Sequence, residues 1–204
     1  MIKKFFIYLK SDGFANAMKF TLKSITSLIY NKSITNIYHK KIDEDESNES
    51  DYDIRNLTLS DIEKLDFPRL KILPYRKWID SGSKLYIIYI NGNPAGFSWI
   101  HFCNYKFTAG LKFVINNDCC WAGPQFIHKD YRGKGLQRII VEYCINKESG
   151  KNVYTSVSNN NIASNKCMIR NKFELIGTTH ITTLFGKEIK KVITPSLNNK
   201  IVKQ

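Results

Sequence analysis

Residues 126–147 read FIHKDYRGKGLQRIIVEYCINK, and this stretch divides into three parts. The first, Phe126 to Tyr131, ends a strand pattern. The second, Arg132 to Gln137, is a short basic turn with two glycines. The third predicts a helix, because its apolar residues recur at i, i+3, i+4, i+7 and i+8. These residues are Leu136, Ile139, Ile140, Tyr143 and Cys144.

A glycine turn between a strand and a helix is suited to binding an anion. The first amides of a helix have no partner within it, and the helix dipole places partial positive charge there. Gly133 and Gly135 let the backbone come close to a ligand, while Arg132 and Lys134 add full charge. The stretch therefore predicts a cradle for a phosphate or a pyrophosphate. The alternative is a tight strand-to-helix connection with solvated charges.

The spacing of this turn excludes two familiar phosphate loops. No Gly-Lys-Ser/Thr follows a four-residue gap, as a Walker loop requires, and Arg138 stands where a dinucleotide motif needs its third glycine. The pattern Arg-x-x-Gly-x-Gln instead resembles the acetyl-CoA motif Gln/Arg-x-x-Gly-x-Gly/Ala of the GNAT superfamily of acyl-CoA N-acyltransferases. Gln137 occupies the last place, where it adds a side chain but keeps a backbone amide.

A second segment supports the resemblance. Asn161-Ile162-Ala163-Ser164, followed by Phe173, is similar to the Asn-x-x-Ser…Gly-Phe segment of the family, with Lys172 in place of the Gly. An Asn cap and a polar helix face would give the same residues. The resemblance implies that acetyl-CoA is the acyl donor and that no metal takes part. It also implies a coenzyme site made of Phe126, Ile127, His128, Arg132, Gly133, Lys134, Gly135, Leu136, Gln137, Asn161 and Ser164.

The reaction implied by the resemblance is acyl transfer from a thioester to an amine. The backbone amide of Ile127 is then the expected donor to the oxyanion. His101 is a candidate base because imidazole titrates near neutral pH, although a hydrogen-bonded core histidine would look the same. Gln125 and Tyr154 are candidate substrate-binding residues. Met168 stands where the family often has a Tyr that protonates the leaving sulfur.

The order of the elements predicts an α+β fold. Hairpins fill the middle of the chain and strand–helix alternation fills only its second half, which favours a mixed sheet flanked by helices. The GNAT resemblance implies a mostly antiparallel sheet of about six to seven strands in which two central strands splay apart. Gly123-Pro124 fits a bulge at that splay, because proline cannot donate to a sheet ladder.

Changes in composition predict four regions. Residues 1–42 are a basic amphipathic N-terminal appendage with a helix, residues 43–51 an acidic linker, residues 52–190 the acetyltransferase domain and residues 191–204 a loose polar tail. Residues 1–41 carry eight lysines and one acid. The appendage is interpreted either as a helix packed on the domain or as a segment lying on an anionic membrane surface.

The composition limits the cellular setting and the partners. The chain has 204 residues, 43% of them hydrophobic, and no apolar run of membrane-spanning length, so a cytoplasmic protein is expected. The five cysteines lack zinc-site spacing and indicate reduced, buried thiols. The net charge of +13 indicates an anionic partner. A homo-oligomer is compatible with the sequence.

A narrower resemblance implies the class of acceptor. Residues 121–126, WAGPQF, look like GNAT members of surface-polysaccharide synthesis, which acetylate an amino group on a nucleotide-linked sugar. Acetylation of a protein or a small amine is the second hypothesis. A non-catalytic basic module on nucleic acid or acidic lipid is the third; the enzyme hypothesis expects no nucleic acid partner, and it allows peripheral association with the inner face of a membrane.

Overall fold

The computed structural model describes Phe6, Ile7, Leu9 and residues 13–43, 50–108, 111–185, 187–197 and 199–203. Its centre is an eight-stranded sheet with the order β10-β9-β1-β8-β7-β4-β3-β2, in which only β7 and β8 pair in parallel. The strands of this sheet are β1 (Tyr30–Lys41), β2 (Asp53–Leu57), β3 (Lys84–Ile90), β4 (Asn93–His101), β7 (Cys119–Ile127), β8 (Asn152–Ser158), β9 (Glu174–Leu184) and β10 (Lys187–Ile193). The mixed, mostly antiparallel fold predicted from the sequence is confirmed, with more strands than expected.

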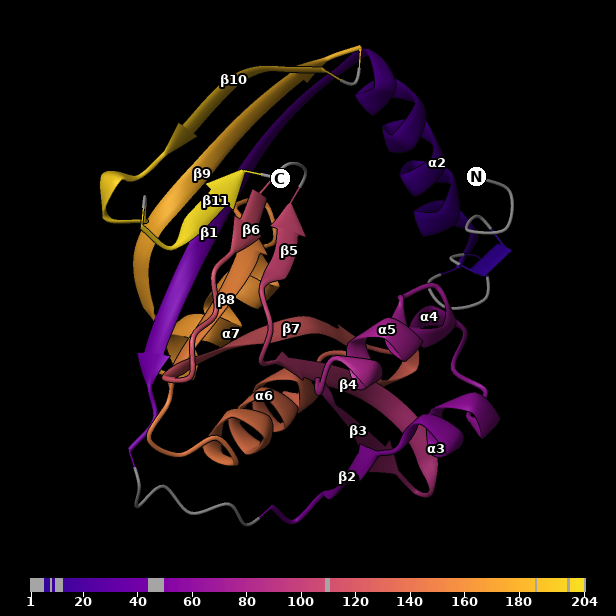
Figure 1. Cartoon of the computed structure of the whole chain (residues 1–204). Helices are drawn as coiled ribbons and strands as arrows, with labels where there is room; N and C mark the ends of the chain where they lie inside the picture. The colour runs from indigo at the N-terminus through magenta and orange to yellow at the C-terminus, as the bar shows by residue number, and fades with distance from the viewer. Residues whose placement is uncertain are drawn as a thin grey trace.

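A second, three-stranded sheet and the helices cover the two faces of the large sheet (Figure 1). The small sheet consists of β5 (Tyr105–Thr108), β6 (Leu111–Phe113) and β11 (Ile201–Lys203). The helical segments are α2 (Phe14–Ile29), α3 (Leu59–Lys64), α4 (Pro68–Lys71), α5 (Tyr75–Asp80), η1 (Lys129–Tyr131), α6 (Leu136–Asn146), α7 (Ile162–Arg170) and η2 (Pro195–Leu197). No helix in the described ranges is long and apolar enough to cross a membrane.

Alternation along the strands divides the core between the two faces. On β3, Tyr86 and Ile88 belong to the cluster that contains the buried side of α6, whereas Leu85 and Ile87 face the opposite way, toward α3 and α4. On the same side as α3 and α4, the small sheet packs over Trp121 of β7 and its neighbours. One face of the sheet therefore carries α6 and α7, and the other carries α3 to α5 beside the small sheet.

The N-terminal region differs from the predicted appendage, because β1 is an interior strand of the large sheet. It lies between β8 and β9, pairing Thr35 with both Ser158 and Thr179. Ile37 is fully buried, which explains why a segment in the basic region is part of the core. A domain beginning at residue 52 would lack this strand of the sheet. Residues 44–49 of the predicted acidic linker lie outside the described residues.

The C-terminal tail also differs from its prediction. β10 reaches Ile193, and β11 pairs antiparallel with β6 through Ile201 and Phe113. Leu197 and Ile201 are buried. Apolar residues spaced among the polar ones therefore anchor this segment to the fold instead of leaving it loose.

The large sheet opens between β7 and β8. Their parallel pairing covers Cys119 to Trp121 on β7, and the hydroxyl of Thr155 then donates to the carbonyl of Ala122 over 2.6 Å. Beyond that point β7 continues beside β4 to Ile127 without β8. Gly123, with φ +122°, and Pro124 lie where the strands part. The expected splay of two central strands is present and is placed at this dipeptide.

Candidate active site at the splayed strands

The glycine turn before α6 has the conformation that an anion cradle needs. Gly133 has φ +80°, and Gly135, the N-cap of α6, has φ +75°. A Cβ atom at either glycine would meet nothing within 4 Å. The left-handed backbone conformation therefore favours glycine at both positions, and neither Cβ would meet another protein atom.

The backbone amides of this turn are available to a ligand. The amides of Arg138 and Ile139 both donate to the carbonyl of Gly135, over 2.9 and 3.3 Å. The amides from Gly133 to Gln137, all in the described part of the chain, donate to no backbone carbonyl. Such unpaired amides at the start of an eleven-residue helix favour an anion.

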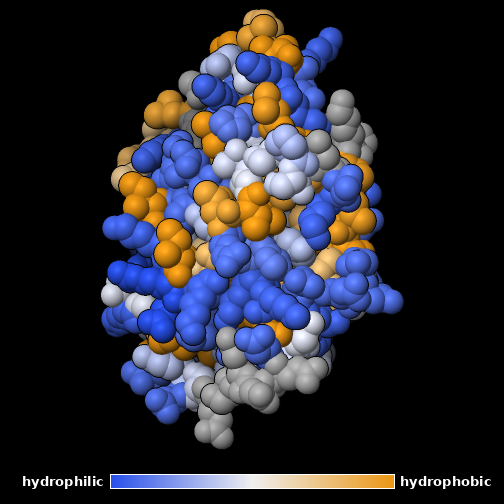
Figure 2. Space-filling model, turned by 90° about the vertical axis from the view of Figure 1, so that its left-hand side faces the viewer, coloured by the Kyte–Doolittle hydropathy of each residue, from blue (hydrophilic) through white to orange (hydrophobic). Residues whose placement is uncertain are grey.

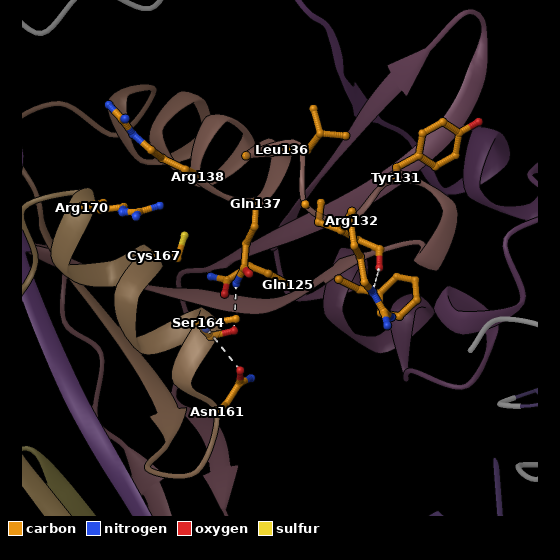
Figure 3. A pocket seen from close by; sticks show the side chains of 15 residues that line it. Gln125, Tyr131, Arg132, Leu136, Gln137, Arg138, Asn161, Ser164, Cys167 and Arg170 are labelled. Atoms are coloured by element: carbon orange, nitrogen blue, oxygen red, sulfur yellow. Dashed lines mark hydrogen bonds between the residues drawn. The ribbon is translucent and has the colours of Figure 1, made fainter. Parts of the chain in front are cut away.

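A pocket of about 480 Å³ opens in front of these amides, between α6 and α7 (Figure 3). Most of the predicted coenzyme residues line it, namely Phe126, Ile127, Arg132, Gly133, Gly135, Leu136, Gln137, Asn161 and Ser164. Two predicted residues, His128 and Lys134, are not among its lining residues. The ammonium of Lys134 lies 5.8 Å from the ring centre of Tyr131 instead.

Sequence reasoning missed two basic residues of this pocket. Arg138, in the first turn of α6, and Arg170, at the end of α7, line the pocket together with Cys167. Both arginines are exposed helical residues, so only the closeness of the two helices marks them as site residues. Burial raises the pKa of the Cys167 thiol to about 11, which keeps it neutral beside the arginines.

Arg132 supports the cradle from its inner side. Its Nε donates to the carbonyl of Ile127 over 3.0 Å, and its guanidinium carbon lies 5.5 Å from the ring centre of Phe126. Arg132 therefore links the end of β7 to the turn while it adds positive charge next to the open amides.

Gln137 extends toward α7. Its Nε2 donates to Ser164 Oγ over 3.1 Å, and the amide of Ser164 donates to the side-chain oxygen of Asn161 over 3.2 Å (Figure 3). Asn161 is thus the N-cap of α7, as the plainer interpretation of the sequence expected. The Asn161 and Ser164 side chains still line the pocket.

The register of β7 shows which strand amides face the splay. The amide of His128 donates to the carbonyl of Ala95 over 2.8 Å, which makes these two residues a hydrogen-bonded pair. In an antiparallel ladder such pairs alternate with open ones. Gly96 and Ile127 form the next pair, which is therefore an open one. Ser98 and Gln125 lie two pairs further along and form another open pair. The N–H groups of Ile127 and Gln125 therefore point away from β4, toward the space that β8 has left.

This alternation refines the predicted use of the strand. The open amide of Ile127 fits its predicted role as a donor to an oxyanion. Phe126 pairs with Phe97 at a hydrogen-bonded position, so Phe126 contributes its ring and not its amide. Gln125 supplies the second open amide. Its side-chain Nε2 is buried and has no hydrogen-bond partner among the described residues.

These groups fit a coenzyme with a diphosphate and a chain of amides. The turn and the arginines suit the diphosphate, and the open edge of β7 with the Gln125 side chain suits carbonyl groups along an extended arm. No group of three or more His, Cys, Asp or Glu in the described residues could hold a metal ion.

His101 lies outside this pocket, in the aromatic core. It is fully buried, its Nδ1 is 2.9 Å from the Ser83 hydroxyl, and its ring stacks 4.4 Å from the ring of Tyr105. Burial lowers the pKa of His101 to about 4. The sequence interpretation as a base does not fit this position; the alternative, a hydrogen-bonded core histidine, does.

Two residues with expected roles, Tyr154 and His128, also lie outside this pocket, and Met168, at the position of the family's Tyr, is part of the core. The Tyr154 hydroxyl accepts from Lys200 Nζ over 2.7 Å on the side of the small sheet, so it does not line the pocket. Met168 is fully buried in the core beneath α6. His128 Nδ1 lies 3.4 Å from a carboxylate oxygen of Asp130, beside a separate pocket under α4.

Comparison with known proteins agrees with this geometry. The model of the acetyltransferase (GNAT) family matches residues 48–172, more than half of the chain, and the protein belongs to this family. No curated protein sequence matches the chain. The matched residues run from the end of the acidic segment to the end of α7 and exclude β1, β9, β10 and β11.

Solved structures share the fold at low sequence identity. A protein from Novosphingobium aromaticivorans assigned to the GNAT family of acetyltransferases is 14% identical, with a TM-score of 0.53 over 76% of this chain and 64% of that one. An acetyltransferase of the GNAT family from Colwellia psychrerythraea is 12% identical, with a TM-score of 0.51 over 86% and 63%. A functionally unknown protein from Staphylococcus epidermidis is 13% identical, with a TM-score of 0.53 over 81% and 67%. The chain spans about two thirds of the length of these proteins.

Proposed function

We propose that the protein transfers an acetyl group from acetyl-CoA to the primary amine of a nucleotide-linked amino sugar used in surface-polysaccharide synthesis. The observation that carries the transferase part is the joint presence of the open amides of Gly133 to Gln137 and the open edge of β7 around one pocket. Membership of the GNAT family supports the same reaction.

One set of residues binds the diphosphate of the coenzyme, and another activates its thioester. The turn, with Arg138 and Arg170, holds the diphosphate. The amides of Ile127 and Gln125 are the donors available to the thioester carbonyl, where negative charge develops during attack. A thiol has a pKa of about 8.5, so its thiolate leaves without strong acid assistance, and the absence of a Tyr at Met168 is tolerable.

The net charge of the chain and one sequence resemblance support the class of acceptor. The net charge of +13 favours an anionic substrate over a polycationic one, and the diphosphate of a nucleotide sugar supplies that charge. The resemblance of residues 121–126 to polysaccharide enzymes supports the same class.

The test is release of coenzyme A from acetyl-CoA in the presence of a panel of amines. Uridine and thymidine diphosphate amino sugars, free glucosamine, lysine peptides and polyamines form the panel. The proposal expects the highest kcat/KM for a nucleotide amino sugar. A preference for peptides would replace the sugar acceptor by a protein, and steeply salt-dependent nucleic acid binding without acetyl-CoA binding would favour a basic module.

Peripheral association with an anionic membrane is the second part of the proposal, supported by an apolar patch that runs along α2 to the turn beside its C-terminal end. Exposed apolar residues of α2 adjoin the turn between β9 and β10, where the amide of Phe185 donates to the carbonyl of Ile29 over 2.7 Å. The patch consists of Phe14, Met18, Leu22, Ile29, Tyr30, Leu184 and Phe185. At the top of Figure 2, hydrophobic residues lie among hydrophilic ones, at the end of the molecule where this turn lies. Lys19, Lys32 and Lys187 in the same elements supply charge of the sign that attracts anionic lipid.

A further inference from the structure

A second pocket, of about 250 Å³, continues the coenzyme pocket through the splay. The two pockets share four lining residues, Gln125, Gln137, Asn161 and Ser164. The second pocket then extends past Gly123 and Pro124 toward the small sheet. A group bound in this second pocket would therefore lie across the open edge of β7 from the coenzyme and its thioester.

Aromatic rings form one wall of this second pocket. Tyr105 and Phe107 project from β5 and lie with ring centres 5.3 and 5.2 Å from Trp121. Hydroxyl-bearing residues of β8, Thr155, Ser156 and Ser158, lie on its other side. A flat apolar wall opposite several hydroxyl groups suits a ring with one apolar face and polar edges, as in a sugar.

No charged or titratable acid–base residue lines the second pocket. Its lining, all of it in the described ranges, includes no Asp, Glu, His, Lys or Arg. An ammonium group entering there would lose its water without gaining a carboxylate partner, which is costly. The pocket also offers no general base to remove a proton from such a group.

Because the pocket has no general base, an amine must already be neutral when it binds. The pKa of the amine therefore decides which substrates can react. A lysine side chain has a pKa of about 10.4 and is almost entirely protonated at pH 7. Neighbouring hydroxyl and ring oxygens withdraw electrons from an amine on a sugar ring and lower its pKa, so a larger fraction is neutral and nucleophilic. A pocket without carboxylates therefore favours a sugar amine over a lysine or a polyamine.

The C-terminal segment holds the aromatic wall in place. β11 pairs with β6, the neighbour of β5, and the amide of Val114 donates to the carbonyl of Lys200 over 2.8 Å. The Lys200 ammonium also donates to the Tyr154 hydroxyl and lies 4.6 Å from the Tyr154 ring centre. Lys200 thereby ties the small sheet to β8.

We infer that this second pocket, with its wall secured by residues 195–197 and 199–203, receives the amine-bearing ring of an uncharged sugar unit; the inference rests on the proposed function. The nucleotide part of the substrate stays outside the pocket. The neutral amine attacks the thioester carbonyl carbon, a C–N bond forms, the C–S bond breaks, and the proton lost by the nitrogen passes through solvent to the thiolate. The products are the acetylated amine and coenzyme A.

The experiment compares Phe107→Ala and Lys200→Met with Phe185→Ala, an exposed phenylalanine on the β9–β10 turn far from the pocket. Each protein is assayed for its melting-temperature rise with acetyl-CoA and for KM and kcat with the best amino sugar of the panel. We expect all three variants to keep the rise with acetyl-CoA. Phe107→Ala should raise the amino-sugar KM at least tenfold and Lys200→Met severalfold, while Phe185→Ala stays at the wild-type value.

The outcomes separate this inference from the proposed function. If the enzyme acetylates lysine peptides or polyamines as fast as amino sugars, or if Phe107→Ala leaves the acceptor KM unchanged, the pocket assignment is overturned while the transferase stands. If acetyl-CoA binds but no amine in the panel is acetylated, the proposed function fails as well. Because Phe107 is only half-buried, its truncation tests the pocket without removing a core residue.

Discussion

Gln137 Nε2 donates to Ser164 Oγ over 3.1 Å, and this bond joins the first turn of α6 to the first turn of α7. The contact turns the long side chain of Gln137 toward α7 and leaves its backbone amide facing the pocket. It explains how a glutamine can stand at the place where the acetyl-CoA motif normally has glycine or alanine.

Removing the Ser164 hydroxyl should weaken coenzyme binding about tenfold. Ser164→Ala loses a pocket hydroxyl and leaves Gln137 without its partner, and one hydrogen bond to a charged group is worth about 1.5–3 kcal/mol. Titration of acetyl-CoA by calorimetry measures the effect. Ser156→Ala, on the acceptor side, is the matched control and should leave the coenzyme Kd unchanged. Equal affinities of wild type and Ser164→Ala would remove Ser164 from the coenzyme site.

Acetyl-CoA should raise the melting temperature of the wild type, and Gly135→Asp should abolish the rise. A ligand at one hundred times its Kd stabilises a protein by about 2.7 kcal/mol. An aspartate at the cradle places a carboxylate against the diphosphate. Gly92→Asp is the matched control, because Gly92 has the same φ of +75° in the turn between β3 and β4. The cradle assignment fails if both variants respond to acetyl-CoA alike.

Stability should fall as the pH drops from about 6.5 toward 4, because of His101. The buried ring has its pKa lowered to about 4, so the unfolded state takes up a proton over this range and the folded state does not. The group stabilises the protein above the unfolded pKa, by up to about 3 kcal/mol, and the contribution is lost on acidification. Urea unfolding at pH 7.5 and pH 5 should show a smaller difference for His101→Phe than for the wild type. The same difference in both proteins would assign the acid sensitivity to other groups.

The apolar patch along α2 and the β9–β10 turn should bind vesicles that contain anionic lipid. Co-sedimentation with vesicles of phosphatidylglycerol and phosphatidylcholine should pull down the wild type, and vesicles of phosphatidylcholine alone should not. Phe14→Ser combined with Phe185→Ser should reduce binding at least fivefold. Ile169→Ser, which alters an exposed apolar residue of α7, is the control. A stable dimer that loses its association with the same double substitution would identify a second copy of the chain as the partner instead.

The local features of the site were predictable from the sequence, because turn chemistry and helix periodicity depend on neighbouring residues. Gly133, Gly135 and the helical spacing from Leu136 onward identified the cradle, and Gly123-Pro124 identified the splay. The N-cap of α7 at Asn161 was equally local. A few consecutive residues determine the backbone conformation of such features, and the tertiary packing of this protein leaves that conformation unchanged.

Long-range pairing was not predictable by the same means. β1 was taken for part of an appendage because its lysines and polar residues hide a short buried core around Ile37. Arg138 and Arg170 join the pocket only through the packing of two helices. His101 resembled a catalytic residue by type, and only its burial among Trp78, Trp99 and Tyr105 excludes it from the pocket.

The place of β1 in the sheet has a consequence for how the protein is made. Thr35 emerges from the ribosome early, yet its neighbours Ser158 and Thr179 are synthesised more than a hundred residues later. Pairings so distant along the chain slow folding, because a large loop must close before they form. The strand waits with both edges open through most of translation, so a nascent chain halted before β8 would expose them to aggregation or to chaperones.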